Sequence, residues 1–271
     1  MTMTDLALAH LTVLDVAPPA LFDLAARAGY QKVGIRILPA APGAVSYPID
    51  RATVIEWRRR MADAGVGAHD VEFLPLTPDV CVHDHAQALA LAAELGAKRF
   101  SVSGDDADTD RLAERFGTLC DLAADVGMGV DLEFMRFRIV GTLPQALDVI
   151  TRAGRRNGRL LIDLLHLFRS GGTAAMLRAV PAEAFGSVQL CDARREDPTN
   201  AGIVEEAREG RLFPGEGELP LAAFMDALPG GIAVSVEVPA ARTHPALGPA
   251  ECAAAACAAS RRLLAGWRPS R

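Results

Sequence analysis

Short apolar runs alternate with longer amphipathic segments along the whole chain. The runs are rich in Val, Ile and Leu, as expected for buried strands, whereas the longer segments repeat apolar residues at helical spacing. The expected strands cover residues 6–14, 32–37, 67–74, 99–103, 129–134, 160–164, 186–191 and 232–238. The expected helices cover residues 18–30, 51–64, 85–95, 110–126, 143–153, 174–180, 219–228 and 249–264.

Strict alternation of strand and helix predicts parallel strands joined by right-handed helical crossovers. Eight such pairs close naturally into a barrel, and the Gly-rich fingerprint that often follows the first strand of an open sheet is missing here. The length of 271 residues also suits one barrel, because α/β barrels commonly run to about 250 residues. We therefore predict an α/β protein, a single (β/α)8 TIM barrel domain over residues 1–271.

One long polar segment, residues 193–217, separates the seventh strand from its helix. Segments of this length within a compact domain usually form binding loops or lids. We expect this segment to lie over a binding site; the alternative is a tolerated surface insertion.

Polar residues stand near the ends of the last four expected strands: Glu133, Asp163, Gln189 and Glu237. Active sites of such barrels lie at the carboxyl ends of the strands. A buried charge is costly unless it is paired or binds a metal, so any single one of these acids is compatible with a structural ion pair. Together they predict an oxygen-rich site for a hard divalent cation, with His166 close by as a base.

Five segments around these residues resemble the xylose isomerase-like TIM barrel family. That family includes sugar isomerases and epimerases, inosose dehydratases, 3-dehydroshikimate dehydratases and, more distantly, endonuclease IV-type enzymes. The matching segments are LEF with Glu133, IDLLH with Asp163 and His166, VQLCD with Gln189, RLFPGEGEL from Arg211, and VEVP with Glu237.

The resemblance implies one divalent metal with Glu133, Asp163 and Glu237 among its ligands. The fourth ligand is then Gln189, where most epimerases of the family have His, and Gln resembles the 3-dehydroshikimate dehydratase branch. An all-oxygen set favours Mn²⁺ or Mg²⁺ over Zn²⁺. We therefore expect Mn²⁺ or Mg²⁺ as the cofactor.

Three arginines and a histidine are candidate substrate ligands. Arg195 and Arg211 align with family positions that face the substrate, and Arg169 follows the sixth strand. His69 lies on the third strand and faces inward if the parity of that strand allows it. Arginines near three carboxylates would offset their excess negative charge, and they also suit a small substrate that carries a carboxylate.

A divalent cation can polarise the carbonyl of a hydroxy-ketone and stabilise the enediolate that forms on proton abstraction. In an isomerase or epimerase, Glu133 and Glu237 would be the acid/base pair. In a dehydratase His166 is the more natural base, because a neutral imidazole suits proton abstraction near pH 7. Alternatively, His166 orients Asp163 by a hydrogen bond.

Three hypotheses follow. The first is a metal-dependent isomerase or epimerase of a small hydroxy-keto, sugar-like compound. The second is a dehydratase (lyase) of a cyclic hydroxy-keto acid such as 3-dehydroshikimate. It gains weight from Gln189 and from Ile139, which stands where the family's epimerases carry a further Glu. The third is a non-catalytic ligand-binding barrel, which requires a site without metal.

Composition argues against several other classes of protein. The formal net charge is −6, and a nucleic-acid-binding protein would normally carry a basic surface. Both lysines, Lys32 and Lys98, start strands, which argues against a Schiff-base enzyme. The five cysteines form no CxxC, and no apolar run is long enough to span a membrane. We expect a cytoplasmic protein without nucleic-acid or membrane partners, and the resemblance implies a homo-oligomer.

Overall fold

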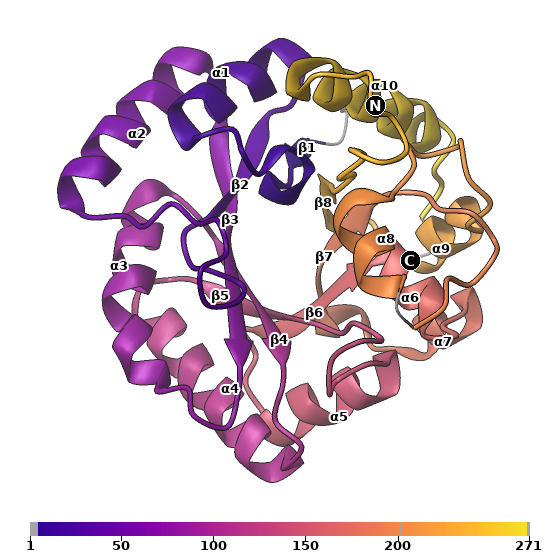
Figure 1. Cartoon of the computed structure of the whole chain (residues 1–271). Coiled ribbons are helices and arrows are strands. Elements are labelled where there is room, and N and C mark those ends of the chain that lie inside the picture. The colour runs from indigo at the N-terminus through magenta and orange to yellow at the C-terminus, as the bar shows by residue number, and fades with distance from the viewer. Residues whose placement is uncertain (1–4, 201, 270–271) are drawn as a thin grey trace.

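The computed structural model describes residues 5–200 and 202–269. In this part of the chain eight parallel strands pair in sequence order and close into a barrel, with β1 next to β8. The helices form a ring outside the strands (Figure 1). The predicted (β/α)8 TIM barrel is therefore confirmed. The strands are β1 Leu6–Leu8, β2 Lys32–Arg36, β3 Gly67–Leu76, β4 Arg99–Gly104, β5 Gly129–Glu133, β6 Gly158–Asp163, β7 Phe185–Leu190 and β8 Ala233–Val236.

The helices that cover the barrel alternate with the strands as predicted, and further short helices occur between them. The α-helices are α1 Pro18–Ala28, α2 Arg51–Ala64, α3 Ala86–Leu95, α4 Thr109–Asp125, α5 Leu143–Ala153, α6 Leu164–Arg169, α7 Ala174–Ala179, α8 Ile203–Glu209, α9 Leu221–Ala227 and α10 Pro249–Ala265. The 3-10 helices are η1 His10–Val13, η2 Val82–His85 and η3 Ala182–Ala184.

Three predicted segments differ from the structure. The expected first strand, residues 6–14, ends at Leu8 and continues as η1, where His10 accepts a hydrogen bond from the backbone N–H of Arg36 (3.0 Å). The chain after β6 turns at once into α6. The polar segment 193–217 is partly helical, because it contains α8. Two residues of this helix, Ile203 and Ala207, are buried. Period and length alone did not separate these short helices from strand or loop.

Local signals fix the ends of several helices. The Asp50 and Asp108 side chains accept hydrogen bonds from the backbone N–H groups of Thr53 (2.7 Å) and Arg111 (3.1 Å) at the starts of α2 and α4. Such caps satisfy donors that have no partner within the helix. At the end of α2, Gly65 adopts a left-handed conformation (φ 73°), which glycine tolerates best.

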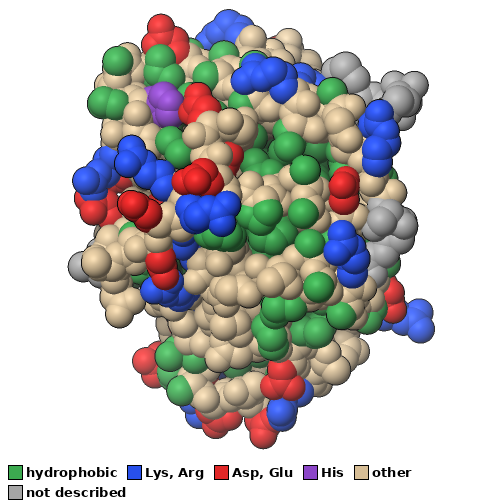
Figure 2. Space-filling model, turned by 90° about the vertical axis from the view of Figure 1, so that its right-hand side faces the viewer, with side chains coloured by type: hydrophobic (Ala, Val, Ile, Leu, Met, Phe, Trp, Pro, Cys, Tyr) green, Lys and Arg blue, Asp and Glu red, His purple; other side chains and the backbone are tan. Residues whose placement is uncertain are grey.

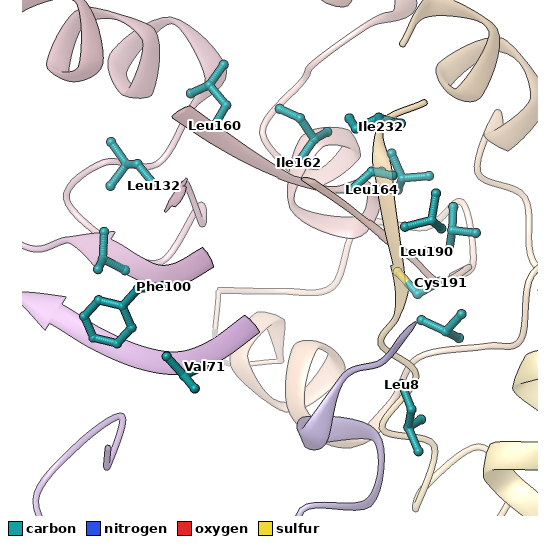
Figure 3. Close-up of a cluster of buried hydrophobic side chains, with 14 of the residues drawn as sticks. Leu8, Val71, Phe100, Leu132, Leu160, Ile162, Leu164, Leu190, Cys191 and Ile232 are labelled. Atoms are coloured by element: carbon teal, nitrogen blue, oxygen red, sulfur yellow. The ribbon is translucent and has the colours of Figure 1, made fainter. Parts of the chain in front are cut away.

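Alternation along the strands separates an apolar outer layer from a polar interior. Val71 and Leu132 belong to the hydrophobic cluster, part of which Figure 3 shows. Their neighbours Glu72 and Glu133 line a cavity inside the barrel instead. Successive side chains of a strand point to opposite faces, so each strand serves the core with one set and the interior with the other.

The outer surface carries charges of both signs. On the face in Figure 2, Lys and Arg side chains alternate with Asp and Glu around an apolar area. Among the described residues, no helix combines the length and the apolar character that crossing a membrane requires.

Candidate active site

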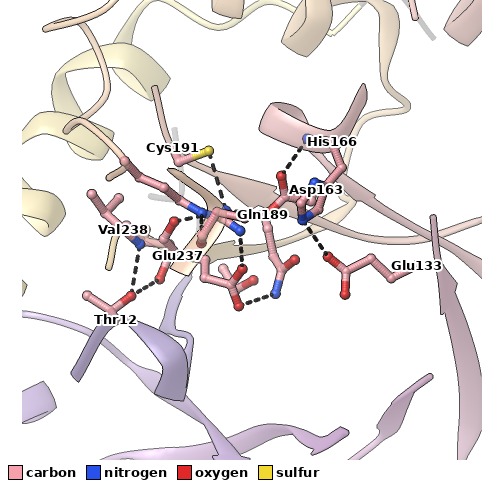
Figure 4. Close-up of polar contacts among 12 residues, drawn as sticks. Thr12, Glu133, Asp163, His166, Gln189, Cys191, Glu237 and Val238 are labelled. Atoms are coloured by element: carbon pink, nitrogen blue, oxygen red, sulfur yellow. Dashed lines mark hydrogen bonds and ion pairs between the residues drawn. The ribbon is translucent and has the colours of Figure 1, made fainter. Parts of the chain in front are cut away.

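The four predicted ligands come together at the carboxyl end of the barrel. Glu133 ends β5 and Asp163 ends β6, while Gln189 lies in β7 directly opposite Asp163. Glu237 follows β8, and its backbone N–H donates to Leu190 (3.0 Å). Figure 4 shows their side chains converging on one region. The fold thus gathers residues that are far apart in the sequence.

Asp163 has two structural partners. One oxygen accepts a hydrogen bond from the backbone N–H of His166 (3.0 Å), so the side chain caps α6. The other accepts from Nη1 of Arg211 (2.5 Å). Asp163 is therefore held in one orientation, although it is almost fully buried.

The backbone around Glu237 is fixed by Thr12 in η1. The Thr12 hydroxyl donates to the carbonyl of Val236 (3.1 Å) and accepts from the N–H of Val238 (3.0 Å), as Figure 4 shows in part. The Glu237 carboxylate accepts from the amide nitrogen of Gln189 (2.9 Å). The position of the Glu237 backbone is thus fixed from η1, and its carboxylate is held from β7.

Arg211 lies within the acid cluster and is 1% exposed. Besides Asp163, it pairs through Nη2 with the Glu237 carboxylate (3.0 Å) and donates to the backbone carbonyls of Ala207 (2.9 Å) and Glu237 (3.2 Å). The sequence predicted a substrate ligand at this position. The structure shows a guanidinium that also bridges two of the predicted metal ligands.

His166 lies against Glu133 rather than turning its ring to Asp163. Its Nε2 is 3.8 Å from Oε1 of Glu133. The rings of His166 and Phe137 pack in a T-shaped arrangement with their centroids 5.5 Å apart. The contact with Asp163 comes from the backbone N–H of His166, so the imidazole itself does not orient this acid. Ligand atoms of Glu133, Asp163 and His166 all lie within 4.8 Å of one another, a spacing suited to a metal ion.

Burial and ion pairs move the pKa values of these groups in different directions. Burial, followed by the charge of Glu237, raises the pKa of Glu133 well above its usual value. Burial also raises the pKa of Glu237 to about 8 despite Arg211. For Asp163, burial acts upward, but Arg211 and His166 outweigh it and lower the pKa. Burial lowers the pKa of His166 to about 4, so its imidazole is neutral near pH 7.

A cavity of about 70 Å³, room for several water-sized groups, is lined by Glu133, His166, Gln189, Arg211 and Glu237. Asp163 is not among its lining residues. One side is apolar, with Phe73, Met135 and Phe137. The charged lining side chains are Glu72, Glu133, Glu237, Arg36, Arg138, Arg208 and Arg211. A larger hollow of about 570 Å³ shares Arg36 and Arg208 with this cavity and adjoins it.

The donor set fits a divalent cation. Four buried carboxyl groups stand here against two buried guanidinium groups, so the ionised cluster carries two uncompensated negative charges; the groups are Glu72, Glu133, Asp163, Glu237, Arg36 and Arg211. The amide oxygen of Gln189 is buried and has no hydrogen-bond partner in the described part of the chain. A dication would balance the charge and use this oxygen.

Three predicted substrate ligands lie elsewhere. Arg169 is buried against Glu206 (2.6 Å) and donates to the carbonyl of Arg194 (2.7 Å), so it holds the segment after β7. Arg195 is exposed and lies 3.6 Å from Glu218. Successive side chains of a strand point to opposite faces, so His69 and its neighbour Asp70 on β3 face different ways. His69 is not among the residues that line the cavity. None of these three lines the cavity, and their role as substrate ligands stays a prediction.

Sequence reasoning assigned no role in the site to Arg36 or Arg138. Arg36 ends β2 and pairs with Glu72 through two hydrogen bonds (3.0 and 2.7 Å). Arg138 follows β5 and lies 3.2 Å from Asp105, while its buried Nε has no partner among the described residues. The position of Arg36 at the end of a strand could have indicated a place in the site. For Arg138 the sequence offered no such indication, because it lies in a loop.

A family model described as xylose isomerase-like TIM barrel matches residues 22–262. The chain belongs to this family. The family resemblance that the sequence motifs suggested is thereby confirmed. Membership makes an enzyme the expected class for the chain.

Two curated relatives are both named 3-dehydroshikimate dehydratase. The Pseudomonas aeruginosa protein is 33% identical over 116 residues, which is 42% of this chain and 18% of the relative. The Pseudomonas putida protein is 27% identical over 120 residues, 44% of this chain and 18% of the relative. The matches thus cover less than a fifth of each relative's length.

Solved structures share the fold at low identity. The IOLI protein with a bound zinc atom has a TM-score of 0.80 at 18% identity and covers 98% of this chain and 99% of its own. The probable 3-DHS dehydratase AsbF from Bacillus anthracis has a TM-score of 0.75 at 12% identity, covering 98% and 100%. A D-psicose 3-epimerase has a TM-score of 0.73 at 15% identity, covering 97% and 100%.

Proposed function

We propose that the chain is a divalent-metal-dependent dehydratase, which removes water from a small cyclic hydroxy-keto acid of the 3-dehydroshikimate type. The observation that carries the proposal is the combination, in one cavity, of buried acids and arginines. The acids suit a cation that binds a hydroxy-ketone, and the arginines suit a substrate carboxylate. The names of the two curated relatives support the same reaction.

Two of the arginines remain for a substrate carboxylate. Arg36 and Arg211 are engaged with buried acids. Arg138 pairs with Asp105 through Nη1 (3.2 Å), but its Nε has no partner in the described part of the chain, and its side chain lines the cavity. Arg208 is exposed at the boundary with the larger hollow. A carboxylate bound at this side would leave the ring of the substrate against Phe137.

The metal would be held by Glu133, Asp163 and Glu237 with the oxygen of Gln189, while His166 lies close by and keeps its imidazole free for the substrate. When bound, such a cation polarises the substrate carbonyl and stabilises the negative charge that develops next to it. These oxygen donors favour Mn²⁺ or Mg²⁺.

In this proposal His166 takes the proton from the carbon beside the carbonyl. The bond from the next carbon to its hydroxyl oxygen then breaks as the C=C bond forms, and the protonated imidazole returns the proton to the hydroxyl, which leaves as water. Before the reaction the imidazole of His166 is neutral, because burial lowers its pKa to about 4. Phe137 and Met135 cover this side of the cavity and keep bulk water from the reacting carbon. Asp163 and Arg211 hold α6 and the segment after α8 around the imidazole.

The role of Arg138 can be tested against a neighbour. Arg138→Gln should raise the KM for 3-dehydroshikimate about tenfold or more, because a charge-assisted hydrogen bond is lost. Arg136→Gln is the matched control, since Arg136 pairs with Asp197 and is not among the cavity-lining residues. Product is followed by the absorbance of the new conjugated double bond. Equal KM values for both variants would refute the assignment of Arg138.

A second candidate is an isomerase or epimerase of a sugar-like hydroxy-ketone. Glu133 and Glu237 both line the cavity, from β5 and from the end of β8, as an acid/base pair would. This reaction exchanges a carbon-bound hydrogen of the substrate with solvent deuterium but produces no conjugated product. Deuterium exchange without a gain in absorbance would therefore favour it over the dehydratase.

A further inference from the structure

A second pair of buried acids lies on β3, below the cavity. Asp70 and Glu72 are 4% and 2% exposed and have the same parity on the strand. Glu72 lines the cavity, whereas Asp70 is not among its lining residues. Neither acid is a proposed metal ligand.

One oxygen of each acid is fully engaged. Oε2 of Glu72 accepts both hydrogen bonds from Arg36, and Oδ2 of Asp70 accepts one from the hydroxyl of Ser101 (3.0 Å). The second oxygens, Oε1 of Glu72 and Oδ1 of Asp70, are buried and have no hydrogen-bond partner within residues 5–200 and 202–269. Leaving two ionised oxygens in this state is costly.

Both free oxygens point at the same place. On the adjacent strand β2, Gly34 has no side chain, and a Cβ there would lie 2.6 Å from Oδ1 of Asp70 and 2.9 Å from Oε1 of Glu72. The absence of a side chain at Gly34 thus gives the two oxygens room to meet over this glycine. Two carboxylates that share a site cannot both ionise easily.

We propose that Asp70 keeps its proton in mildly acidic solution and donates it from Oδ1 to Oε1 of Glu72, so that the pair is a one-proton site beneath the cavity. Arg36 makes Glu72 the ionised partner, because its two hydrogen bonds favour the carboxylate. Asp70 has a neutral hydroxyl partner in Ser101 instead. Asp70 is then a positioning residue that fixes the orientation of Glu72 in the cavity.

The charges around Asp70 agree with this assignment. Burial, and then the charge of Glu72, raise the pKa of Asp70 to about 7, against the smaller opposing effects of Ser101 and Arg36. Arg99 on β4 is a further cation within electrostatic reach. Because the folded pKa is raised, the folded protein binds a proton that the unfolded chain releases above about pH 4. The pair should lose this proton as the pH rises through about 7.

Infrared spectroscopy of the whole protein tests the proposal. A protonated carboxyl group has a C=O stretching band that an ionised one lacks, and ¹³C in the aspartate carboxyl carbon shifts that band for aspartic acids only. The band at about pH 6 should include one aspartic acid and should weaken through about pH 7. Glu133 and Glu237 do not interfere, because the label leaves glutamic acids unshifted. No aspartic acid band at pH 6 would overturn the proposal.

Variants identify the residue. Asp70→Asn should remove the labelled band, whereas Asp106→Asn should leave it, because Asp106 is buried but ion-paired with Arg111 (2.6 Å) and Arg115 (3.2 Å). A band that survives Asp70→Asn would contradict the assignment. If this variant does not fold, Gly34→Ala separates the two oxygens while keeping both acids, and should shift or abolish the band.

Kinetics provides a second readout, which rests on the proposed function. Asn can still donate to Glu72, so Asp70→Asn should keep kcat/KM within about threefold of the wild type, whereas Asp70→Ala should lose about tenfold. Equal losses in both variants would argue against a donated hydrogen bond. The infrared result does not depend on the reaction, so it stands even if the dehydratase assignment fails.

Discussion

Arg211 is the residue on which the acid cluster depends most. Its guanidinium donates to Asp163 and lies 3.0 Å from a carboxylate oxygen of Glu237. Burial acts to lower its pKa, but the two carboxylates outweigh this effect and raise the pKa well above the usual value. The charge of Arg211 is therefore permanent, and it keeps Asp163 ionised in an environment that would otherwise favour protonation.

Arg211→Met should destabilise the metal-free protein by about 3–5 kcal/mol, because removing one member of a buried ion pair leaves its partners uncompensated. Unfolding in urea with a chelator present measures this loss. Arg242→Met is the control, since Arg242 and its ion-pair partner Glu205 are half exposed, and it should cost about 1 kcal/mol or less. Similar losses for both variants would contradict the central position given to Arg211.

At this scale the sequence identified the acids but not their partners. An acid in an apolar run is unusual, so Glu133, Asp163 and Glu237 were visible from the pattern alone. The pairing of Arg211 with Asp163 joins residues far apart in the sequence and depends on the direction of both side chains. No spacing rule contains that information.

At the scale of elements, the strands and the long helices were predictable and the short helices were not. Alternating apolar runs and helical periodicity mark β2 to β8 and helices such as α4, because many residues contribute to each pattern. The helix η1 is held by a tertiary contact of Thr12 with Val236, whereas the short helix α6 begins at the local cap from Asp163. The helix α8 buries only Ile203 and Ala207. Two of these three, η1 and α6, fix the positions of Glu237 and His166.

Arg169 joins α6 to α8 and to the segment before it. It pairs with Glu206 in α8 and donates to the carbonyl of Arg194. Arg169→Gln should therefore loosen residues 194–210 and increase hydrogen exchange there several-fold, since local opening becomes easier. Arg195→Gln, at an exposed position, is the control. Unchanged exchange in the Arg169 variant would show that other contacts suffice to hold this segment.

At the scale of the whole molecule, the fold and the family are established, and the reaction is our proposal. The barrel places the carboxyl ends of all its strands at one edge. This is why Glu133, Gln189 and Glu237, from β5, β7 and the end of β8, line one cavity, with Asp163 of β6 beside them. The same scaffold occurs in structures named for an epimerase and a dehydratase. Side chains within the cavity, not the scaffold, must therefore decide the chemistry.

The central claim is metal-dependent loss of water from a cyclic hydroxy-keto acid. The most direct measurement incubates protein freed of metal by a chelator with 3-dehydroshikimate and records the absorbance of a conjugated product before and after Mn²⁺ is added. The account predicts a rise only after Mn²⁺ and a loss of at least about a hundredfold in Glu237→Gln, because the site loses a charged ligand. An equal rate without metal, or no conjugated product with any divalent cation, would contradict it.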